Sequence, residues 1–276
     1  MKYAQLVMGP AGSGKSTYCN TIYNHCLNVG RHVMCVNLDP ACEHFNYPAS
    51  VDIRDLISLD DVLEDEELTF GPNGALVFCM EYLTQNFDWL HEHLNEGEDD
   101  YFIFDLPGQI ELYTHLPVMR QLADALRGWD FNVCSVFLID TQFVLDSEKF
   151  VSGALTALSA MVSLETPHVN VLTKMDMLSD ENRQLVEEFL ETDPSALVEL
   201  DNHLWNERHR ALTRSIAQIL EEYSLVKFLP LDSNDEDSIT EALMVIDNTI
   251  QYGEDLEVKD RYPEETDDQE TNDLNL

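Results

Sequence analysis

Gly9-Pro10-Ala11-Gly12-Ser13-Gly14-Lys15-Ser16 matches the pattern G-x-x-x-x-G-K-S/T, in which each fixed position has its own role. Glycines let the backbone turn tightly and bring successive N–H groups close to phosphate oxygens. The Lys15 ammonium supplies a point charge for the β- and γ-phosphates of a nucleotide, and the Ser16 hydroxyl can bind a magnesium ion. The pattern therefore predicts a phosphate site made by Gly12, Ser13, Gly14, Lys15, Ser16 and Thr17.

The residues on either side of this loop support the same interpretation. Residues 3–8 form an apolar run that is typical of a buried strand, and a helical pattern begins at Lys15. The N-terminus of that helix would add its partial positive charge to the phosphate site. The simpler alternative, a glycine-rich turn with an exposed lysine, requires neither Ser16 nor three glycines.

Farther along the chain, apolar strand-like runs alternate with helical patterns, which indicates βαβ units and a parallel sheet. The expected strands are Tyr3–Met8, His32–Leu38, Tyr101–Phe104, Val133–Ile139, Val169–Leu172 and Val226–Leu229. The expected helices include Lys15–Leu27, Leu116–Leu126 and Ser147–Ser163. The predicted fold class is α/β, a P-loop NTPase with a mostly parallel sheet flanked by helices. Right-handed connections would put its ligand at the carboxyl ends of the strands.

Two intervals are too long for simple crossovers, and a third segment differs in composition. Residues 46–95 and 179–224 are rich in charged, helix-forming sequence, and we expect helical insertions there on one P-loop domain that spans residues 1–253. Residues 254–276 carry ten acidic and two basic residues and few large apolar ones. That composition predicts a disordered acidic tail.

The formal net charge of −38 at pH 7 is spread over the chain and is not confined to the tail. A surface this acidic repels the phosphates of nucleic acids and of anionic lipids, so we expect no direct nucleic-acid or membrane contact. Two explanations of the charge remain open. The surface either binds basic protein surfaces or keeps the protein soluble by self-repulsion.

Composition also bears on the compartment. The chain has no run of 18 apolar residues, so no transmembrane helix is expected, and a strand near the N-terminus leaves no room for a signal peptide. Six cysteines occur without any C-x-x-C pair, which favours free thiols in a reducing compartment over a zinc site. We therefore expect an intracellular protein.

Residues 101–109, Tyr-Phe-Ile-Phe-Asp-Leu-Pro-Gly-Gln, form an apolar strand that ends at Asp105. A carboxylate in this position suits indirect magnesium binding through water, as in P-loop NTPases. Gly108 could offer its N–H group to the γ-phosphate, so that the turn senses whether that phosphate is present. A strand ending in D-x-P-G is also a common turn, and the preceding phosphate loop favours the functional interpretation.

Residues 173–176, Thr-Lys-Met-Asp, follow another predicted strand. The Asp176 carboxylate can accept two hydrogen bonds from guanine N1 and its exocyclic amine, which adenine cannot supply. The Lys174 stem can pack on the base, whereas Thr173 stands where asparagine is common and has a hydroxyl in place of an amide. GTP is therefore favoured over ATP. The segment 231–233, Leu-Asp-Ser, is our candidate for the last loop of the base pocket.

Asp39 closes the second predicted strand beside the phosphate loop. There its carboxylate can hold a magnesium-bound or attacking water, but the pair Asp39-Pro40 can equally form a simple turn. The residues alone leave these two readings open.

Taken together, four segments resemble those of the GPN-loop GTPases: Gly71-Pro72-Asn73, residues 37–41 (Asn-Leu-Asp-Pro-Ala), residues 105–111 (Asp-Leu-Pro-Gly-Gln-Ile-Glu) and residues 173–176. The resemblance runs from the N-terminus to about residue 255. Residues 44–47, 78–82 and 251–255 are similar to the third of the family's three eukaryotic branches.

This resemblance implies roles for several residues. Family members dimerise across their nucleotide sites, and the Gly-Pro-Asn loop of one subunit enters the site of the other, so Asn73 is expected to act in trans. Gln109 and Glu111 are expected to position water near the γ-phosphate, with Ser16, Asp39 and Asp105 around Mg²⁺. No arginine finger is evident. Catalysis would then consist mostly of positioning and electrostatics.

The resemblance implies a GTP/GDP- and Mg²⁺-dependent molecular switch that hydrolyses GTP. It also implies a role in assembly and nuclear import of RNA polymerase II, with polymerase III left open, in a heterodimer with the first paralogue or in a homodimer. The expected location is cytoplasmic, with shuttling to the nucleus left open. Two alternatives remain: a nucleotide-holding subunit with little turnover of its own, and a P-loop kinase that acts on a small molecule.

Overall fold

The computed structural model describes residues 1–65, 68–95, 101–191, 211–212, 214–216, 218–219 and 226–253. Within these residues, seven strands form one sheet in the order β3-β2-β4-β1-β5-β6-β7, and every neighbouring pair is parallel. The strands are β1 Lys2–Met8, β2 Met34–Asn37, β3 Ala49–Asp52, β4 Tyr101–Asp105, β5 Phe131–Asp140, β6 His168–Thr173 and β7 Phe228–Pro230. The predicted α/β P-loop architecture is confirmed.

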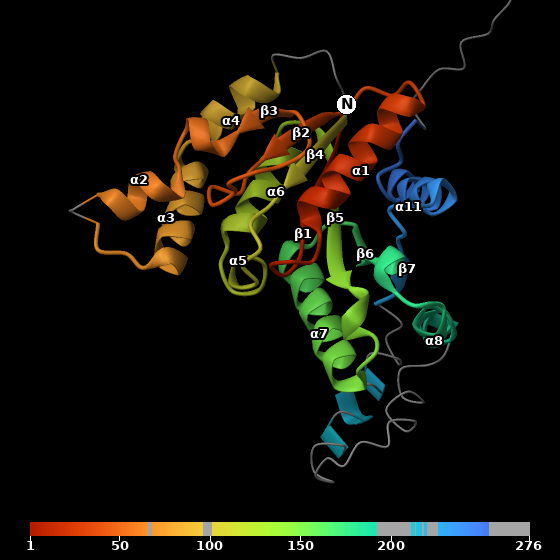
Figure 1. The fold of residues 1–276 in the computed structure, drawn as a ribbon. Coiled ribbons are helices and arrows are strands. Elements are labelled where there is room, and N and C mark those ends of the chain that lie inside the picture. Colours follow the sequence, from red (N-terminus) through yellow and green to blue (C-terminus); the bar gives the residue numbers. More distant parts are fainter. Residues whose placement is uncertain are drawn as a thin grey trace, which may run out of the picture.

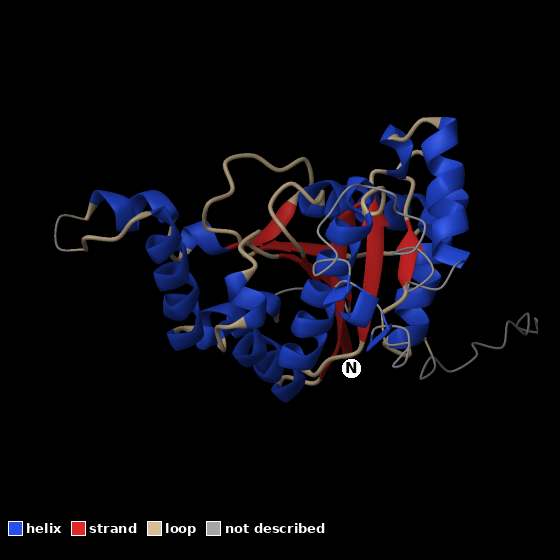
Figure 2. Cartoon of the chain, turned by 90° about the horizontal axis from the view of Figure 1, so that it is seen from below, coloured by secondary structure: helices blue, strands red, loops and turns tan. Residues whose placement is uncertain are grey.

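Helices cover both faces of this sheet (Figures 1 and 2). They are α1 Lys15–Asn28, α2 Leu59–Glu64, α3 Pro72–Gln85, α4 Phe87–Leu94, α5 Glu111–Thr114, α6 Val118–Gly128, α7 Ser147–Leu164, α8 Asp180–Glu191 and α11 Glu236–Thr249. Three short 3-10 turns, η1 Ile53–Asp55, η2 Thr141–Phe143 and η3 Met175–Met177, follow strands β3, β5 and β6. Helices α2 and α3 project away from the sheet in Figure 1.

Strand β1 shows why the sheet is covered on both faces. Its residues 3–8 are all buried, as expected for a parallel strand between two helical layers. Side chains alternate between the faces, so Ala4, Leu6 and Met8 join one apolar core, while Tyr3 and Val7 join the other. The first core is shared with α6 and α7 and the second with α1 and α11.

The order of the strands locates the ligand site. The chain runs from β1 to β2 on one side and later returns through β5 on the other side, so the connections diverge around β1. In open parallel sheets the crevice at such a switch point, beyond the carboxyl ends of the strands, is the usual ligand site. In Figure 1 the loop from β1 to α1 lies at that end of the sheet, as does α5.

The predicted strands all exist, with boundaries that differ by a few residues. One strand was missed: β3 lies inside residues 46–95, where we expected only helices, and it adds a seventh strand at the sheet edge. Its sequence alternates apolar Ala49 and Val51 with polar Ser50 and Asp52, so it is not the apolar run by which the other strands were predicted. In the second expected insertion, residues 192–210, 213, 217 and 220–224 lie outside the described residues, as does the whole expected tail, 254–276.

The cysteines and the helices bear on two further expectations. All six cysteines are free thiols, and five of them are buried. None of the helices within the described residues combines the length and apolar character needed to cross a membrane.

Candidate functional site

The loop between β1 and α1 has a backbone that glycine adopts readily and other residues do not. Gly9, Gly12 and Gly14 have φ angles of 144°, 79° and 89°. A Cβ atom at Gly9 would lie 2.3 Å from the carbonyl oxygen of Leu138 on β5. Gly14 immediately precedes α1, so the N–H groups of the loop and of the first helical turn lie at one end of the helix. These N–H groups belong to the residues for which the sequence predicts phosphate binding.

Lys15 lies beneath the loop, and only 9% of the residue is exposed. Its Nζ donates hydrogen bonds to the carbonyl oxygens of Gly9 at 3.2 Å and Pro10 at 3.3 Å. Burial lowers the pKa of the ammonium group, and the negative charges of Asp105 and Asp39 act against that effect. The loop thus holds a cation where phosphate oxygens can replace weak carbonyl partners.

Asp105 ends β4 and is 2% exposed. Its Oδ2 accepts a hydrogen bond of 2.8 Å from the hydroxyl of Tyr47, while its Oδ1 is buried without a well-formed partner. Burial raises the pKa of Asp105, and the neighbouring hydroxyls of Ser16 and Tyr47 and the Lys15 charge hold that rise back. A buried carboxylate oxygen with no partner beside Ser16 is a vacant acceptor in the site.

Asp39 follows β2 and is half-buried. Its Oδ1 accepts a hydrogen bond of 3.0 Å from the N–H of Ala41, which is the turn geometry that the Asp39-Pro40 pair suggested. Burial raises the pKa of Asp39, opposed by that N–H group and by Lys15. The two readings of Asp39 are therefore compatible, because one oxygen shapes the turn while the carboxylate still interacts with Lys15.

These residues suit magnesium bound together with a phosphate. Among the described residues, no group of three or more His, Cys, Asp and Glu side chains could hold a metal ion by itself. Magnesium characteristically keeps several waters and takes one or two carboxylates plus substrate phosphates. The unpartnered Oδ1 of Asp105 and the nearby hydroxyl of Ser16 fit that requirement.

The turn after β4 lies against the phosphate loop. A Cβ atom at Gly108 would come within 2.9 Å of both Ala11 Cα and Lys15 Nζ, so only glycine fits there. Gln109 is half-buried, and its Oε1 is buried without a partner. Glu111, the first residue of α5, is exposed. Gly108 and Gln109 therefore adjoin the site, whereas Glu111 faces solvent.

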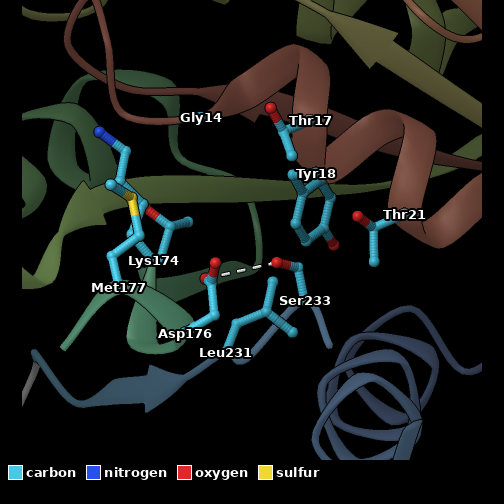
Figure 3. Close-up of a pocket in the computed structure, with 10 residues that line it drawn as sticks. Gly14, Thr17, Tyr18, Thr21, Lys174, Asp176, Met177, Leu231 and Ser233 are labelled. Atoms are coloured by element: carbon cyan, nitrogen blue, oxygen red, sulfur yellow. Dashed lines mark hydrogen bonds between the residues drawn. The ribbon is translucent and has the colours of Figure 1, made fainter. Parts of the chain in front are cut away.

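A pocket opens beside the phosphate loop, with a cavity volume of about 160 Å³. It is lined by Gly14, Thr17, Tyr18, Thr21, Thr173, Lys174, Asp176, Met177, Leu231 and Ser233. Figure 3 shows Asp176 and Ser233 on one side of this pocket and Thr17, Tyr18 and Thr21 of α1 on the other. The exposed Asp176 carboxylate accepts a hydrogen bond of 3.3 Å from the Ser233 hydroxyl. The predicted base-binding segments thus meet in one cavity.

Thr173 and Lys174 use their polar atoms for positioning. The Thr173 hydroxyl lies 2.7 Å from the carbonyl oxygen of Ser13, to which it donates, and 3.2 Å from that of Ile139. Lys174 has a left-handed backbone, with φ of 64°, and its ammonium pairs with Asp140 at 2.7 Å. In Figure 3 that ammonium points away from Asp176. Both residues line the pocket while anchoring it.

The segment 231–233 is held from two sides. Asp232 is 8% exposed, forms an ion pair with Arg183 of α8, and accepts a hydrogen bond of 2.9 Å from the N–H of Asn234. Burial alone would raise the pKa of Asp232, but the hydrogen bonds from Arg183 and Asn234 lower it overall. Arg183 also donates to the carbonyl oxygen of Met175 at 3.1 Å, so it ties η3 to this loop.

Asn73 does not line the base pocket, and it lies apart from the phosphate loop. It is the second residue of α3, after Gly71 and Pro72, and it is exposed. No hydrogen bond joins its side chain to another described residue. Figure 1 shows α3 standing apart from the loop between β1 and α1, beyond α5. Within one chain, the Gly-Pro-Asn segment therefore lies away from the phosphate loop.

The sequence reading missed three aromatic residues near the site. Tyr18 lines the base pocket, and its hydroxyl donates to Gln5 at 2.8 Å. Tyr47 reaches Asp105, and Tyr113 of α5 is fully buried with its hydroxyl near the backbone of Gly9. The i, i+3 and i, i+4 spacing of Thr17, Tyr18 and Thr21 could have indicated a shared helix face. No sequence spacing marks Tyr47 or Tyr113.

Comparison with known proteins identifies the family. Residues 7–252 match a family model described as "Conserved hypothetical ATP binding protein". A Danio rerio protein named GPN-loop GTPase 3 is 56% identical over 273 residues, which cover 98% of this chain and 95% of that protein. Proteins of the same name from Dictyostelium discoideum and Schizosaccharomyces pombe are 55% and 46% identical, over 94% and 98% of this chain and 90% and 99% of their own lengths.

A solved structure supports the fold independently. The crystal structure of a GTPase in apo form from Pyrococcus abyssi has a TM-score of 0.76 and 22% sequence identity, and the match covers 90% of this chain and 97% of that one. At that identity the likeness concerns the fold alone. The nearly full-length relatives carry the assignment and confirm the resemblance seen in the motifs: the chain belongs to the GPN-loop GTPase family.

Proposed function

We propose that this protein binds GTP together with Mg²⁺ and hydrolyses it. The observation that carries this proposal is the hydrogen bond from Thr173 to Ser13, because it joins a base pocket containing Asp176 to the phosphate loop containing Lys15. One nucleotide can therefore reach both parts. The names of the relatives add support, since each is called a GTPase.

Different residues of the site bind the phosphates, the base and Mg²⁺, and others position the attacking water. The N–H groups from Gly12 to Thr17 and the Lys15 ammonium bind the phosphates, and Asp176 accepts hydrogen bonds from guanine. Ser16 and Asp105, with Asp39 beside them, would hold Mg²⁺, which would supply charge neutralisation at the phosphates. The free Oε1 of Gln109 accepts a hydrogen bond from the attacking water. Glu111, the exposed first residue of α5, helps to position that water near the γ-phosphate.

We further propose that hydrolysis requires a second subunit. Asn73 is exposed and apart from its own phosphate loop, as a residue acting on a partner's site would be. The amide of Asn73 can donate and accept hydrogen bonds, so it suits contact with phosphate or water. The partner is the first paralogue of the family or a second copy of this chain.

The cellular role in the proposal is delivery of RNA polymerase II, and of polymerase III as an open extension, from cytoplasmic assembly to the nucleus. Its support is the family resemblance. Affinity purification of the full chain from cells at moderate salt tests it, and recovery of the first paralogue together with polymerase subunits is the expected result. Purification without either would contradict both the partner and the role.

The decisive biochemical experiment is equilibrium titration with GTP and ATP, followed by single-turnover GTP hydrolysis. We expect preference for GTP and loss of binding in Lys15→Ala, with Lys227→Ala as a matched control because Lys227 is exposed and outside the site. Preference for ATP that survives Asp176→Ala would favour the kinase alternative. Heterodimer turnover that is unchanged by Lys15→Ala in this subunit would favour a nucleotide-holding role.

A further inference from the structure

Tyr47 is a buried residue that contacts the site but belongs to none of the phosphate-, magnesium- or base-binding motifs described above. It lies in the segment between β2 and β3, and only 3% of it is exposed. Its hydroxyl donates a hydrogen bond of 2.8 Å to Oδ2 of Asp105. Burial and the adjacent Asp105 carboxylate raise the pKa of Tyr47, so the phenol keeps its proton and remains a donor.

This contact orients the Asp105 carboxylate. Of its two oxygens, Oδ2 is bound to Tyr47, while Oδ1 is buried and lacks a well-formed partner. A carboxylate with one oxygen fixed cannot rotate freely, so the contact presents Oδ1 to the group beside it. That oxygen is the vacant acceptor near Ser16 that suits bound magnesium.

The Tyr47 ring is itself held in place. It stacks on Phe45, with ring centroids 4.8 Å apart and planes at 13°. The Arg54 guanidinium lies 5.1 Å from the Phe45 ring centroid and donates to the carbonyl oxygen of Cys42 at 2.9 Å. Residues 42–47 are therefore pinned to η1 by Arg54, which keeps the Tyr47 hydroxyl at Asp105.

Arg54 is also connected, through other residues, to Asp39, the second carboxylate of the site. Arg54 forms an ion pair of 2.6 Å with Asp52, and Asp52 accepts a hydrogen bond of 2.9 Å from Asn37. Asn37 in turn accepts from the N–H of Asp39 at 3.1 Å. A continuous set of contacts thus connects Asp105, through Tyr47 and Arg54, to the backbone at Asp39.

We propose that Tyr47 is a positioning residue for the magnesium-nucleotide site, and that it sets the concentration of Mg²⁺ needed to retain nucleotide. The inference rests on the proposed GTP and Mg²⁺ binding and adds a residue to it. Partners that orient a metal-binding side chain typically contribute 10–100-fold to metal affinity. Removing the hydroxyl takes away the hydrogen-bond donor of Oδ2, so the carboxylate is less firmly oriented.

The test is the Mg²⁺ dependence of nucleotide release. Tyr47→Phe keeps the ring and its stacking on Phe45 and removes only the hydroxyl. We would load wild type and variant with fluorescent GDP and measure its dissociation rate across a Mg²⁺ titration and in excess EDTA. The Mg²⁺ concentration at half-maximal retention should rise about 10-fold in the variant. The rate in EDTA should be unchanged, because a purely structural defect would speed release there too.

Tyr23→Phe is the matched control, since Tyr23 lies on α1, is partly buried and lines neither pocket nor phosphate loop. Its half-maximal Mg²⁺ concentration should equal that of the wild type. Thermal unfolding of each nucleotide-free variant checks the fold. Should Tyr47→Phe not fold, Phe45→Leu, which removes the ring packed on Tyr47, should shift the Mg²⁺ requirement in the same direction.

The outcomes separate the two proposals. A folded Tyr47→Phe with the wild-type Mg²⁺ requirement overturns the role of Tyr47 and leaves GTP binding intact. Faster release in EDTA as well as in Mg²⁺ also overturns it, because the residue would then support the fold of the site in general. A wild type that binds no guanine nucleotide overturns the proposed function, and this inference with it.

Discussion

The hydroxyl of Thr173 lies 2.7 Å from the carbonyl oxygen of Ser13, so the end of β6 is bonded directly to the phosphate loop. Thr173 is 5% exposed and also lies 3.2 Å from the carbonyl oxygen of Ile139 on β5. The single hydroxyl hydrogen is therefore shared between a carbonyl of the phosphate loop and a carbonyl near the end of β5, and it holds the base pocket and the phosphate loop in fixed relation. The role of Thr173 is therefore to connect the two parts of the site, which differs from direct contact with the base.

Thr173→Val should loosen that connection while keeping the shape of the side chain. Loss of one buried hydrogen bond typically lowers the free energy of unfolding by about 1–2 kcal/mol. GTP affinity should also fall, because the loop and the pocket would no longer be held together. Denaturant unfolding and nucleotide titration measure both effects. Thr173→Ser, which keeps the hydroxyl, is the control, and equal losses in both variants would contradict the argument.

Much of this site could be anticipated from local sequence, and the reason is geometric. Gly9–Ser16 follows β1, Asp105 ends β4, and Asp176 lies shortly after β6. Parallel strands bring their carboxyl ends to one edge of the sheet. A motif at each strand end is then sufficient to predict that the residues meet. Six of the seven strands could be recognised because they lie in mainly apolar runs, as is typical of strands in a parallel sheet.

What could not be anticipated depends on contacts between distant segments. Tyr47 reaches Asp105, and Arg183 pairs with Asp232, across intervals that no local pattern marks. Strand β3 has four residues, half of them polar, and its pairing with β2 depends on the sheet already being formed. Such features follow from packing, which neither hydrophobic periodicity nor turn chemistry reports.

Lys15→Ala should abolish tight nucleotide binding. Within the part of the chain that the structure describes, the ammonium donates to two carbonyl oxygens, at 3.2 and 3.3 Å, and these long bonds can be exchanged for bonds to phosphate. Charge-assisted hydrogen bonds contribute about 1.5–3 kcal/mol each, and losing two of them corresponds to a fall in affinity of about 100-fold or more. Titration with fluorescent GDP measures this loss, and Lys227→Ala should bind as the wild type does. An affinity within 3-fold of the wild type would remove Lys15 from the phosphate site.

Asp176→Asn should change which base is bound. The carboxylate only accepts hydrogen bonds, whereas an amide also donates, so it loses its match to the guanine N1–H and amine donors. A site whose polar group is left mismatched can discriminate by several orders of magnitude, and we expect GTP affinity to fall about 100-fold or more. Xanthosine triphosphate, which has a carbonyl oxygen in place of the guanine amine, should bind better to the variant than to the wild type. Competition titrations with the two nucleotides make the comparison.

Ser233→Ala serves as the control for that experiment. Its hydroxyl only donates to Asp176 over 3.3 Å, so its removal should change GTP affinity by about 3-fold or less, in keeping with a weak exposed hydrogen bond. If Asp176→Asn instead binds GTP as the wild type does, Asp176 is not the group that selects the base, and the pocket would require another polar partner.

Asp105→Asn should make the nucleotide-free protein more stable and less able to respond to magnesium. Burial raises the pKa of Asp105, so the folded state disfavours its charged form. For a raised carboxyl pKa, that penalty is absent below the unfolded value of about 3.9 and develops as pH rises through the folded pKa. The asparagine carries no charge and therefore has no such penalty. Its amide oxygen can still accept the hydrogen bond from the Tyr47 hydroxyl. At pH 7 its free energy of unfolding should exceed that of the wild type by about 1 kcal/mol, a common gain where a functional group is removed. The difference should shrink on acidification below the folded pKa.

Unfolding in denaturant at pH 7 and at pH 4 measures the trend, and release of fluorescent GDP should no longer be slowed by Mg²⁺. An Asp105→Asn protein that is less stable at pH 7, or that retains GDP in Mg²⁺ as the wild type does, would contradict the assignment of this carboxylate.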